Sequence, residues 1–204
     1  YGCGGGNLDD ALAYNLAQVE AYGYTPRVRF TAKVKFSAGV QKGDEENRGG
    51  TRLYTLTEDG LTNDCVDSQG FRLDDPQNIA DYIVETTKRL PAKHYILVLW
   101  NHGYDFFIFD QPVSTAYPEK VVTRELVYDD NTGEAISIFE LEEGLKRSGI
   151  KLDMVYWDVC TMNMIENIYQ VKDYTDYVLG SGHLTPELGG NYAQLMHALD
   201  THSD

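Results

Sequence analysis

The sequence predicts an α/β fold in which helices flank a mostly parallel central sheet. Apolar runs of strand length alternate with segments of helical spacing, and Gly, Pro or Asp residues bound most of them. The clearest run, Tyr95–Trp100, is apolar throughout, which is typical of a strand buried on both faces. In sheets of this kind ligands bind beyond the carboxyl ends of the strands, so the residues that follow the strands are the first candidates for a site.

The first third of the chain predicts a turn, a helix and two strands. Gly2–Asn7 resembles a phosphate-binding loop only superficially, because it lacks the final glycine and the Lys-Ser/Thr ending, and a turn is expected. Asp9–Tyr22 has helical spacing and ends before a glycine. Arg27–Phe36 alternates apolar and polar residues, as in a half-exposed strand. A polar segment (41–50) separates it from a short strand near 52–57, so these two strands are expected to form a hairpin.

The middle of the chain predicts one capped helix, the buried strand and a long loop. Asp75 is placed to cap the helix, Pro76 lies in its first turn, and Pro91 ends it. From Tyr104 to Gly133 there is no strong periodicity apart from a possible short strand around Val121. Loops of this length are usually functional or flexible.

The last third continues the alternation of strands and helices. Ser137 and Glu140 form a capping-box pattern for a helix that ends at Gly149. Four further elements are expected in the order strand, helix, strand, helix: 151–157, 164–171, 177–181 and 192–199. No internal repeat or linker divides the chain, so one domain spanning residues 1–204 is expected.

Composition excludes two classes of protein. With 32 acidic and 17 basic residues the formal net charge is -15, and no basic stripe is present, so nucleic-acid binding is not expected. No apolar run approaches the roughly 20 residues that a membrane span needs. The chain begins abruptly at Tyr1, so an upstream segment is expected to have been removed or left out.

Cysteine usage directs attention to thiol chemistry. The three cysteines include no C-x-x-C pair, so neither a disulfide framework nor a structural zinc site is expected, and at least one thiol should be free. Cys160 follows a predicted strand and precedes a helix, whose amino end would favour the thiolate. His102 follows the strand Tyr95–Trp100 and is suited to proton transfer. The N–H groups of Gly103 and Cys160 are candidates for an oxyanion hole.

Position alone leaves two interpretations of these residues open. A cysteine after a core strand is more often an inert small hydrophobe, and a histidine at a strand end is commonly a hydrogen-bonded loop residue. The order His102 before Cys160 matches the caspase-like arrangement of a cysteine peptidase. The motifs around the two residues favour the interpretation as the catalytic pair of a cysteine peptidase.

Two motifs resemble those of the clostripain family of clan CD cysteine peptidases. Residues 91–103 (PAKHYILVLWNHG) resemble the histidine motif of that family, and residues 158–166 (DVCTMNMIE) resemble its nucleophile motif. Weaker similarities are found at residues 7–9 and at four positions further on: Ser181, Pro186, Gly189 and Tyr192. The sequence departs from the family at Gly182-His183, where an acidic residue is common, and at Gly190, where an aromatic residue is common.

The resemblance implies a caspase-like fold and cleavage of peptide bonds after Arg or Lys through a Cys–His dyad and an acyl-enzyme. It implies that Asp158 and Ser181 contact the substrate, with Asp158 supplying the basic specificity. Residues two apart on a strand share a face, so Asp158 should lie on the side of Cys160. The alternative is that Asp158 only orders its own loop by accepting hydrogen bonds from backbone N–H groups.

Several further expectations follow from the resemblance. The family is usually longer, so the single domain is expected to be incomplete at one or both ends. Self-processing is expected at Lys120 or Arg124, and a secreted, cell-surface or periplasmic bacterial protein is expected. No cofactor is expected to be required; family members are associated with calcium, but the acidic residues between Asp129 and Glu134 lack the EF-hand pattern.

The partners expected are peptides or proteins with Arg or Lys at the cleaved bond, and the oligomeric state is left open. Two other functions remain to be distinguished. One is a non-catalytic relative that binds basic peptides or a partner in the same cleft, and the other is a different cysteine enzyme such as an acyltransferase.

Overall fold

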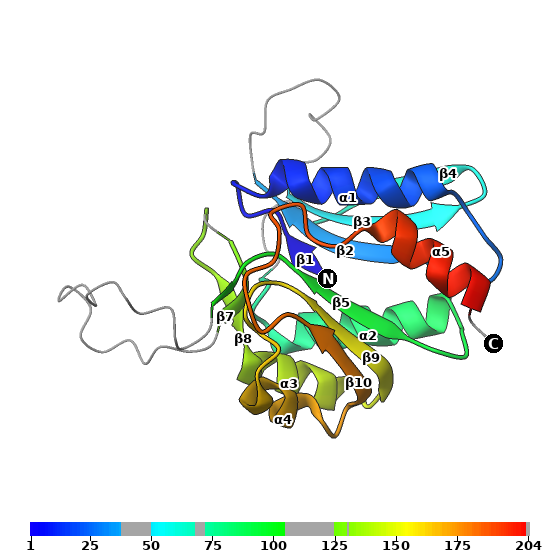
Figure 1. The fold of residues 1–204 in the computed structure, drawn as a ribbon. Helices are drawn as coiled ribbons and strands as arrows, with labels where there is room; N and C mark the ends of the chain where they lie inside the picture. Colours follow the sequence, from blue (N-terminus) through cyan, green and yellow to red (C-terminus); the bar gives the residue numbers. More distant parts are fainter. Residues whose placement is uncertain (38–49, 68–71, 105–124, 130, 203–204) are drawn as a thin grey trace.

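A seven-stranded sheet forms the centre of the computed structural model (Figure 1), which describes residues 1–37, 50–67, 72–104, 125–129 and 131–202. The strands lie in the order β10-β9-β5-β1-β2-β3-β4. Their bounds are β1 Gly2–Cys3, β2 Thr31–Phe36, β3 Gly50–Thr57, β4 Gly60–Asp67, β5 Ile96–Trp100, β9 Leu152–Asp158 and β10 Thr175–Gly180. The strands from β10 to β2 pair in parallel, and β3 and β4 add an antiparallel edge. The expectation of a mostly parallel α/β fold is therefore confirmed.

Five helices cover the two faces of this sheet among the described residues. They are α1 Asp9–Tyr22, α2 Pro76–Arg89, α3 Ile138–Ser148, α4 Ile165–Val171 and α5 Tyr192–His202. Figure 1 shows α1 and α5 on one side of the sheet and α2, α3 and α4 on the other. A small antiparallel sheet lies beside the main one, made of β6 Gly103–Tyr104, β7 Glu125–Tyr128 and β8 Ala135–Ser137.

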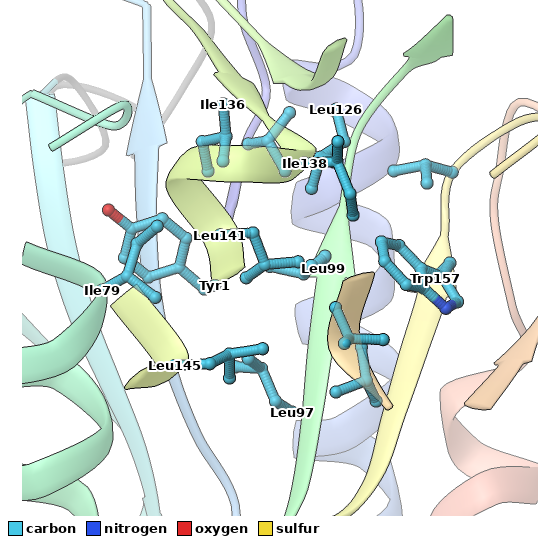
Figure 2. Packing of buried hydrophobic residues seen from close by; sticks show 14 of the residues in the cluster. Tyr1, Ile79, Leu97, Leu99, Leu126, Ile136, Ile138, Leu141, Leu145 and Trp157 are labelled. Carbon is cyan, nitrogen blue, oxygen red and sulfur yellow. The ribbon is translucent and has the colours of Figure 1, made fainter. Parts of the chain in front are cut away.

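Each face of the main sheet has its own hydrophobic core because side chains alternate along the strands. Leu97 and Leu99 of β5 pack with α2, α3 and Trp157 of β9 on one face, as Figure 2 shows. Trp100 of β5 belongs to the opposite core, together with α1 and α5. The strand Tyr95–Trp100 is therefore covered on both faces, as its apolar sequence predicts.

The two capping patterns form as predicted. The Asp75 carboxylate accepts a hydrogen bond from the Gln77 backbone N–H at 2.8 Å, which satisfies a free donor at the start of α2. Ser137 Oγ accepts from the Glu140 N–H at 3.2 Å, and the Glu140 carboxylate accepts from the Ser137 N–H at 2.7 Å. These local bonds explain why the starts of both helices could be placed from sequence.

Other expectations were incomplete or wrong. Gly2–Cys3 is not part of a turn but forms β1 in the middle of the sheet, and the turn begins only at Gly5. The predicted hairpin exists, although its first strand starts at Thr31; just before it, the Phe30 carbonyl accepts from the Leu56 N–H of β3 at 3.0 Å. The strand β4 and the small sheet β6-β7-β8 were not predicted. The possible strand around Val121 lies outside the described residues.

None of the helices in the described part of the chain has the length and apolar character that crossing a membrane requires.

Candidate functional site

The parallel pairing of β5 with β9 brings the two sequence motifs together. Trp100, the last residue of β5, lies opposite Asp158, the last residue of β9. The Asn101 N–H continues this contact by donating to the Asp158 carbonyl at 3.4 Å. His102 and Cys160 therefore each lie two residues beyond a matched pair, at the same carboxyl edge of the sheet.

Gly103 allows the loops after β5 and β9 to touch. A Cβ atom added at this position would overlap the Cys160 carbonyl oxygen and lie 3.0 Å from the Cys160 nitrogen. A side chain is thus excluded where the His102 loop meets the Cys160 backbone. The structure brings together three of the predicted site residues: His102, Gly103 and Cys160.

Asn101 anchors the loop that contains His102, a role that sequence reasoning missed. Its buried side chain donates to the Cys3 carbonyl at 2.6 Å and accepts from the Tyr128 N–H at 2.7 Å. The amide thereby connects the ends of β1, β5 and β7 at one point. The His102 carbonyl also accepts from the Val127 N–H at 3.1 Å, so the backbone on both sides of the imidazole is held.

The imidazole of His102 meets a side chain from the turn after β1. The His102 Nε2 atom lies 3.0 Å from Asn7 Nδ2 and 3.2 Å from Asn7 Oδ1. Asn7 stands in the sequence similarity at residues 7–9, but nothing in the sequence alone indicates this contact.

The Cys160 thiol is partly exposed and is contacted by Thr185. The Thr185 N–H donates to Cys160 Sγ at 3.4 Å, and the Thr185 hydroxyl lies 3.4 Å from the same sulfur. Sequence reasoning missed Thr185 because it lies in the non-repetitive loop 181–190. The expected helix amino end is not at the sulfur, since α4 begins only at Ile165 and such an effect is confined to the first turn. The Thr185 N–H donates to the sulfur instead.

The loop 181–190 runs along the segment that follows Cys160. The Thr161 N–H donates to the His183 carbonyl at 3.0 Å, and the Asn163 N–H donates to the Ser181 carbonyl at 3.1 Å. Ser181 Oγ accepts from the His183 N–H at 3.0 Å and so stabilises the loop itself. Thr161 has a φ of 57°, an uncommon conformation for a β-branched residue and one that concentrates at functional sites.

Asp158 is a buried carboxylate, 4% exposed, at the start of the same loop system. Its two oxygens lie 3.1 and 3.0 Å from the Gly190 N–H, and Oδ2 accepts from the Tyr192 hydroxyl at 2.7 Å. Burial and the neighbouring Asp158 charge raise the pKa of Tyr156 and Tyr192, so both phenols stay protonated. Asp158 thus orders a loop, but a different one from the loop after its own strand.

Helix α1 holds the other side of this loop. Asn15 Nδ2 donates to the Leu188 carbonyl at 3.0 Å and the Gly190 carbonyl at 3.3 Å, while its Oδ1 accepts from Trp100 Nε1 at 2.8 Å. A Cβ at position 190 would lie 2.6 Å from the Tyr156 hydroxyl oxygen, so a larger residue here would require the Tyr156 side chain to shift. The departure at Gly190 thus coincides with a close approach of the Tyr156 hydroxyl to this backbone.

The acidic residues considered for calcium have another partner. Lys35 Nζ lies 2.7 Å from Asp129 and 3.1 Å from Glu134, so these carboxylates already share a cation. Among the residues that the structure describes, no group of three or more His, Cys, Asp or Glu side chains is placed to hold a metal ion. Asp130, Lys120 and Arg124 lie outside the described residues.

The solved structures that share this fold are C11 cysteine proteases. The X-ray structure of a secreted C11 cysteine protease from Bacteroides thetaiotaomicron, "iotapain", superposes with a TM-score of 0.68 and 21% identity, covering 97% of this chain and 55% of that one. A complex of a secreted C11 cysteine protease from the same organism with an irreversible peptide inhibitor superposes with a TM-score of 0.67 and 18% identity, covering 96% of this chain and 51% of that one. An inactive zymogen C11 protease from Parabacteroides distasonis superposes with a TM-score of 0.57 and 19% identity, covering 92% of this chain and 49% of that one.

The family model of Peptidase_C11, the clostripain family, matches residues 44–204. The chain therefore belongs to the clostripain family, as the two motifs predict. It spans about half the length of the solved structures that it matches. No curated protein matches the chain.

We predict that Gly103→Ala destabilises the fold because the new methyl group forces the His102 loop away from the Cys160 backbone. The free energy of unfolding should fall by about 1–3 kcal/mol, the usual cost of overpacking, as measured by urea denaturation. Gly182→Ala is the matched control, since a Cβ there meets nothing closer than the Asn163 carbonyl oxygen at 4.0 Å. Equal stability of the two variants would contradict the close approach.

Proposed function

We propose that this chain forms the catalytic part of a cysteine endopeptidase that cleaves after Arg or Lys, with Cys160 and His102 as its dyad. The observation that supports this most is the contact of Gly103 with the Cys160 backbone, because it places the two motifs of a clostripain-family chain at one sheet edge. Secretion is described for two of the solved relatives, and we propose a secreted or surface location here as well. Recovery of the protein only from the cytosolic fraction of its source cells would contradict that location.

The proposed reaction has two steps. The Cys160 sulfur attacks the scissile carbonyl carbon, while the N–H groups of Gly103 and Cys160 donate to the developing oxyanion. His102 takes the thiol proton and delivers it to the leaving amine as the C–N bond breaks, which leaves an S-acyl enzyme. Water then attacks the acyl carbon, with His102 as the base, and the thiol is restored.

Basic specificity is proposed for Asp158, with Ser181 on the wall of the same cleft. Among the described residues the buried Asp158 carboxylate has no ion-pair partner, and its bonds come from a backbone N–H and a phenol. A buried anion gains most from a cation that reaches it with good geometry, and a guanidinium or ammonium from the substrate would supply that charge. Binding would then require Gly190 to give up its bonds to the carboxylate.

The first test compares two cysteines of the same chain. We expect wild type to release the fluorophore from an Arg-containing peptide substrate, and Cys160→Ala to lose more than about 1,000-fold in rate because the nucleophile is gone. Cys3→Ala is the matched control: the Cys3 side chain is buried, and it should retain turnover per folded molecule. A folded wild type that binds the peptide without cleaving it would instead support a non-catalytic binding protein.

The second test separates the charge of Asp158 from its structural bonds. Asp158→Asn should lower kcat/KM for Arg and Lys substrates by about 30-fold or more, the scale for truncating one partner of a buried charge pair. Tyr192→Phe removes the 2.7 Å bond but keeps the charge, so its preference for Arg and Lys over neutral residues should survive. If both variants lose the same activity on every substrate, Asp158 acts only by ordering the loop.

The third test concerns self-processing at Lys120 or Arg124, which we propose from the sequence. Purified wild type incubated alone should yield fragments ending at one of these residues, detected by intact mass spectrometry. Cys160→Ala should stay whole under the same conditions because cleavage needs the thiol. An unchanged mass in protein that does turn over an Arg substrate would count against self-processing.

A further inference from the structure

Asn7 contacts His102 at the ring nitrogen that faces the turn after β1. Both amide heavy atoms lie within hydrogen-bond distance of Nε2, Nδ2 at 3.0 Å and Oδ1 at 3.2 Å. Only one of these two atoms can bond Nε2 at a time. Which of them does so determines whether the imidazole can act as a base at its other nitrogen.

The turn that contains Asn7 is held by buried hydrogen bonds, so the contact is built into the fold. The Gly4 N–H donates to the Lys35 carbonyl at 2.8 Å, and the Leu8 N–H donates to the Gly4 carbonyl at 3.0 Å. The buried Asp9 carboxylate accepts from the Ser37 N–H at 3.2 Å. These bonds lie on both sides of Asn7 and fix its backbone against the sheet, while its side chain stays at the exposed mouth of the site.

A neutral imidazole carries one proton, and only its unprotonated nitrogen can accept the thiol proton. If Asn7 Oδ1 accepts from Nε2–H, the lone pair lies on Nδ1, and the same bond persists when the ring becomes imidazolium. If Asn7 Nδ2 donates to Nε2 instead, the proton lies on Nδ1 and the ring cannot act as a base there. The first arrangement is the one that is compatible with proton transfer in both directions.

We propose that Asn7 is a positioning residue for His102: its carbonyl oxygen accepts from Nε2–H and so fixes the tautomer in which the lone pair lies on Nδ1. The catalytic consequence rests on the proposed dyad, whereas the tautomer itself does not. Removal of Asn7 should therefore affect proton transfer to the leaving group more than substrate binding.

Kinetics on two kinds of leaving group test this role. Asn7→Leu should lower kcat/KM, which covers only the steps up to the acyl-enzyme, by about 10- to 100-fold on an Arg amide, part of the 10²–10⁴-fold that general acid–base catalysis contributes. The loss of kcat/KM on a p-nitrophenyl ester of Arg should be less than about threefold, because that leaving group departs without a proton. Asn7→Asp keeps the acceptor and should recover most of the amide activity. Asn63→Leu is the matched control, because it replaces an exposed asparagine on β4 by the same residue.

A readout that needs no activity tests the tautomer directly. In the Cys160→Ala background, nitrogen-15 NMR of the five histidines, with His102→Gln for assignment, should show the Nε2–H form of His102 at a pH where the ring is neutral. Asn7→Leu should then mix the two tautomers. An Nδ1–H ring in the parent protein, a tautomer unchanged by Asn7→Leu, or equal losses on amide and ester would each overturn the proposal. Wild type without any peptidase activity would overturn only the proposed function, since the NMR result still decides the contact.

Discussion

The register between β5 and β9 is the constraint on which the rest of the site depends. Leu97 and Leu99 face one core and Trp100 the other, and Val155 and Trp157 are fully buried on the neighbouring strand. A slip by one residue would exchange these faces, so burial of the apolar side chains fixes which residues leave the sheet together. Burial on both sides of the sheet thus disfavours such a slip, and the segments that contain His102 and Cys160 leave the sheet side by side. The absence of a side chain at Gly103 then lets the two loops come into contact.

Asp158 connects the carboxyl end of β9 to the end of the loop 181–190. A carboxylate buried to this extent needs hydrogen-bond donors, and here Gly190 and Tyr192 provide them. Asn15 of α1 holds the same loop from the other side through two carbonyls. The structural and the specificity interpretations of Asp158 are therefore compatible, because a substrate cation would replace bonds that hold the loop in its absence. The departure from the family at Gly190 lies where this loop touches the carboxylate.

Local signals in the sequence predict a large part of the fold, and contacts made only in the folded chain account for what they miss. The caps at Asp75 and Ser137 and the long apolar strands were placed correctly because each signal lies within a few residues. The two residues of β1 and the short strands β6 to β8 are too short to show a period. The same limit applies to the site: His102 and Cys160 stand in motifs, whereas Asn7 and Thr185 reach them from distant loops. No spacing along the chain indicates such contacts.

Cys3 and Cys160 show what a motif adds to the position of a cysteine. Both lie at the carboxyl ends of strands in the same sheet, which is the feature that left the sequence interpretation open. Cys3 is fully buried, and burial together with the Asp129 charge raises the pKa of its thiol, so it remains protonated and packs as a small apolar residue. Cys160 is partly exposed, and the Thr185 N–H donates to its sulfur. Two features therefore distinguish the candidate nucleophile Cys160 from the inert thiol of Cys3. Cys160 is accessible to solvent, and the loop 181–190 supplies a hydrogen-bond donor to its sulfur.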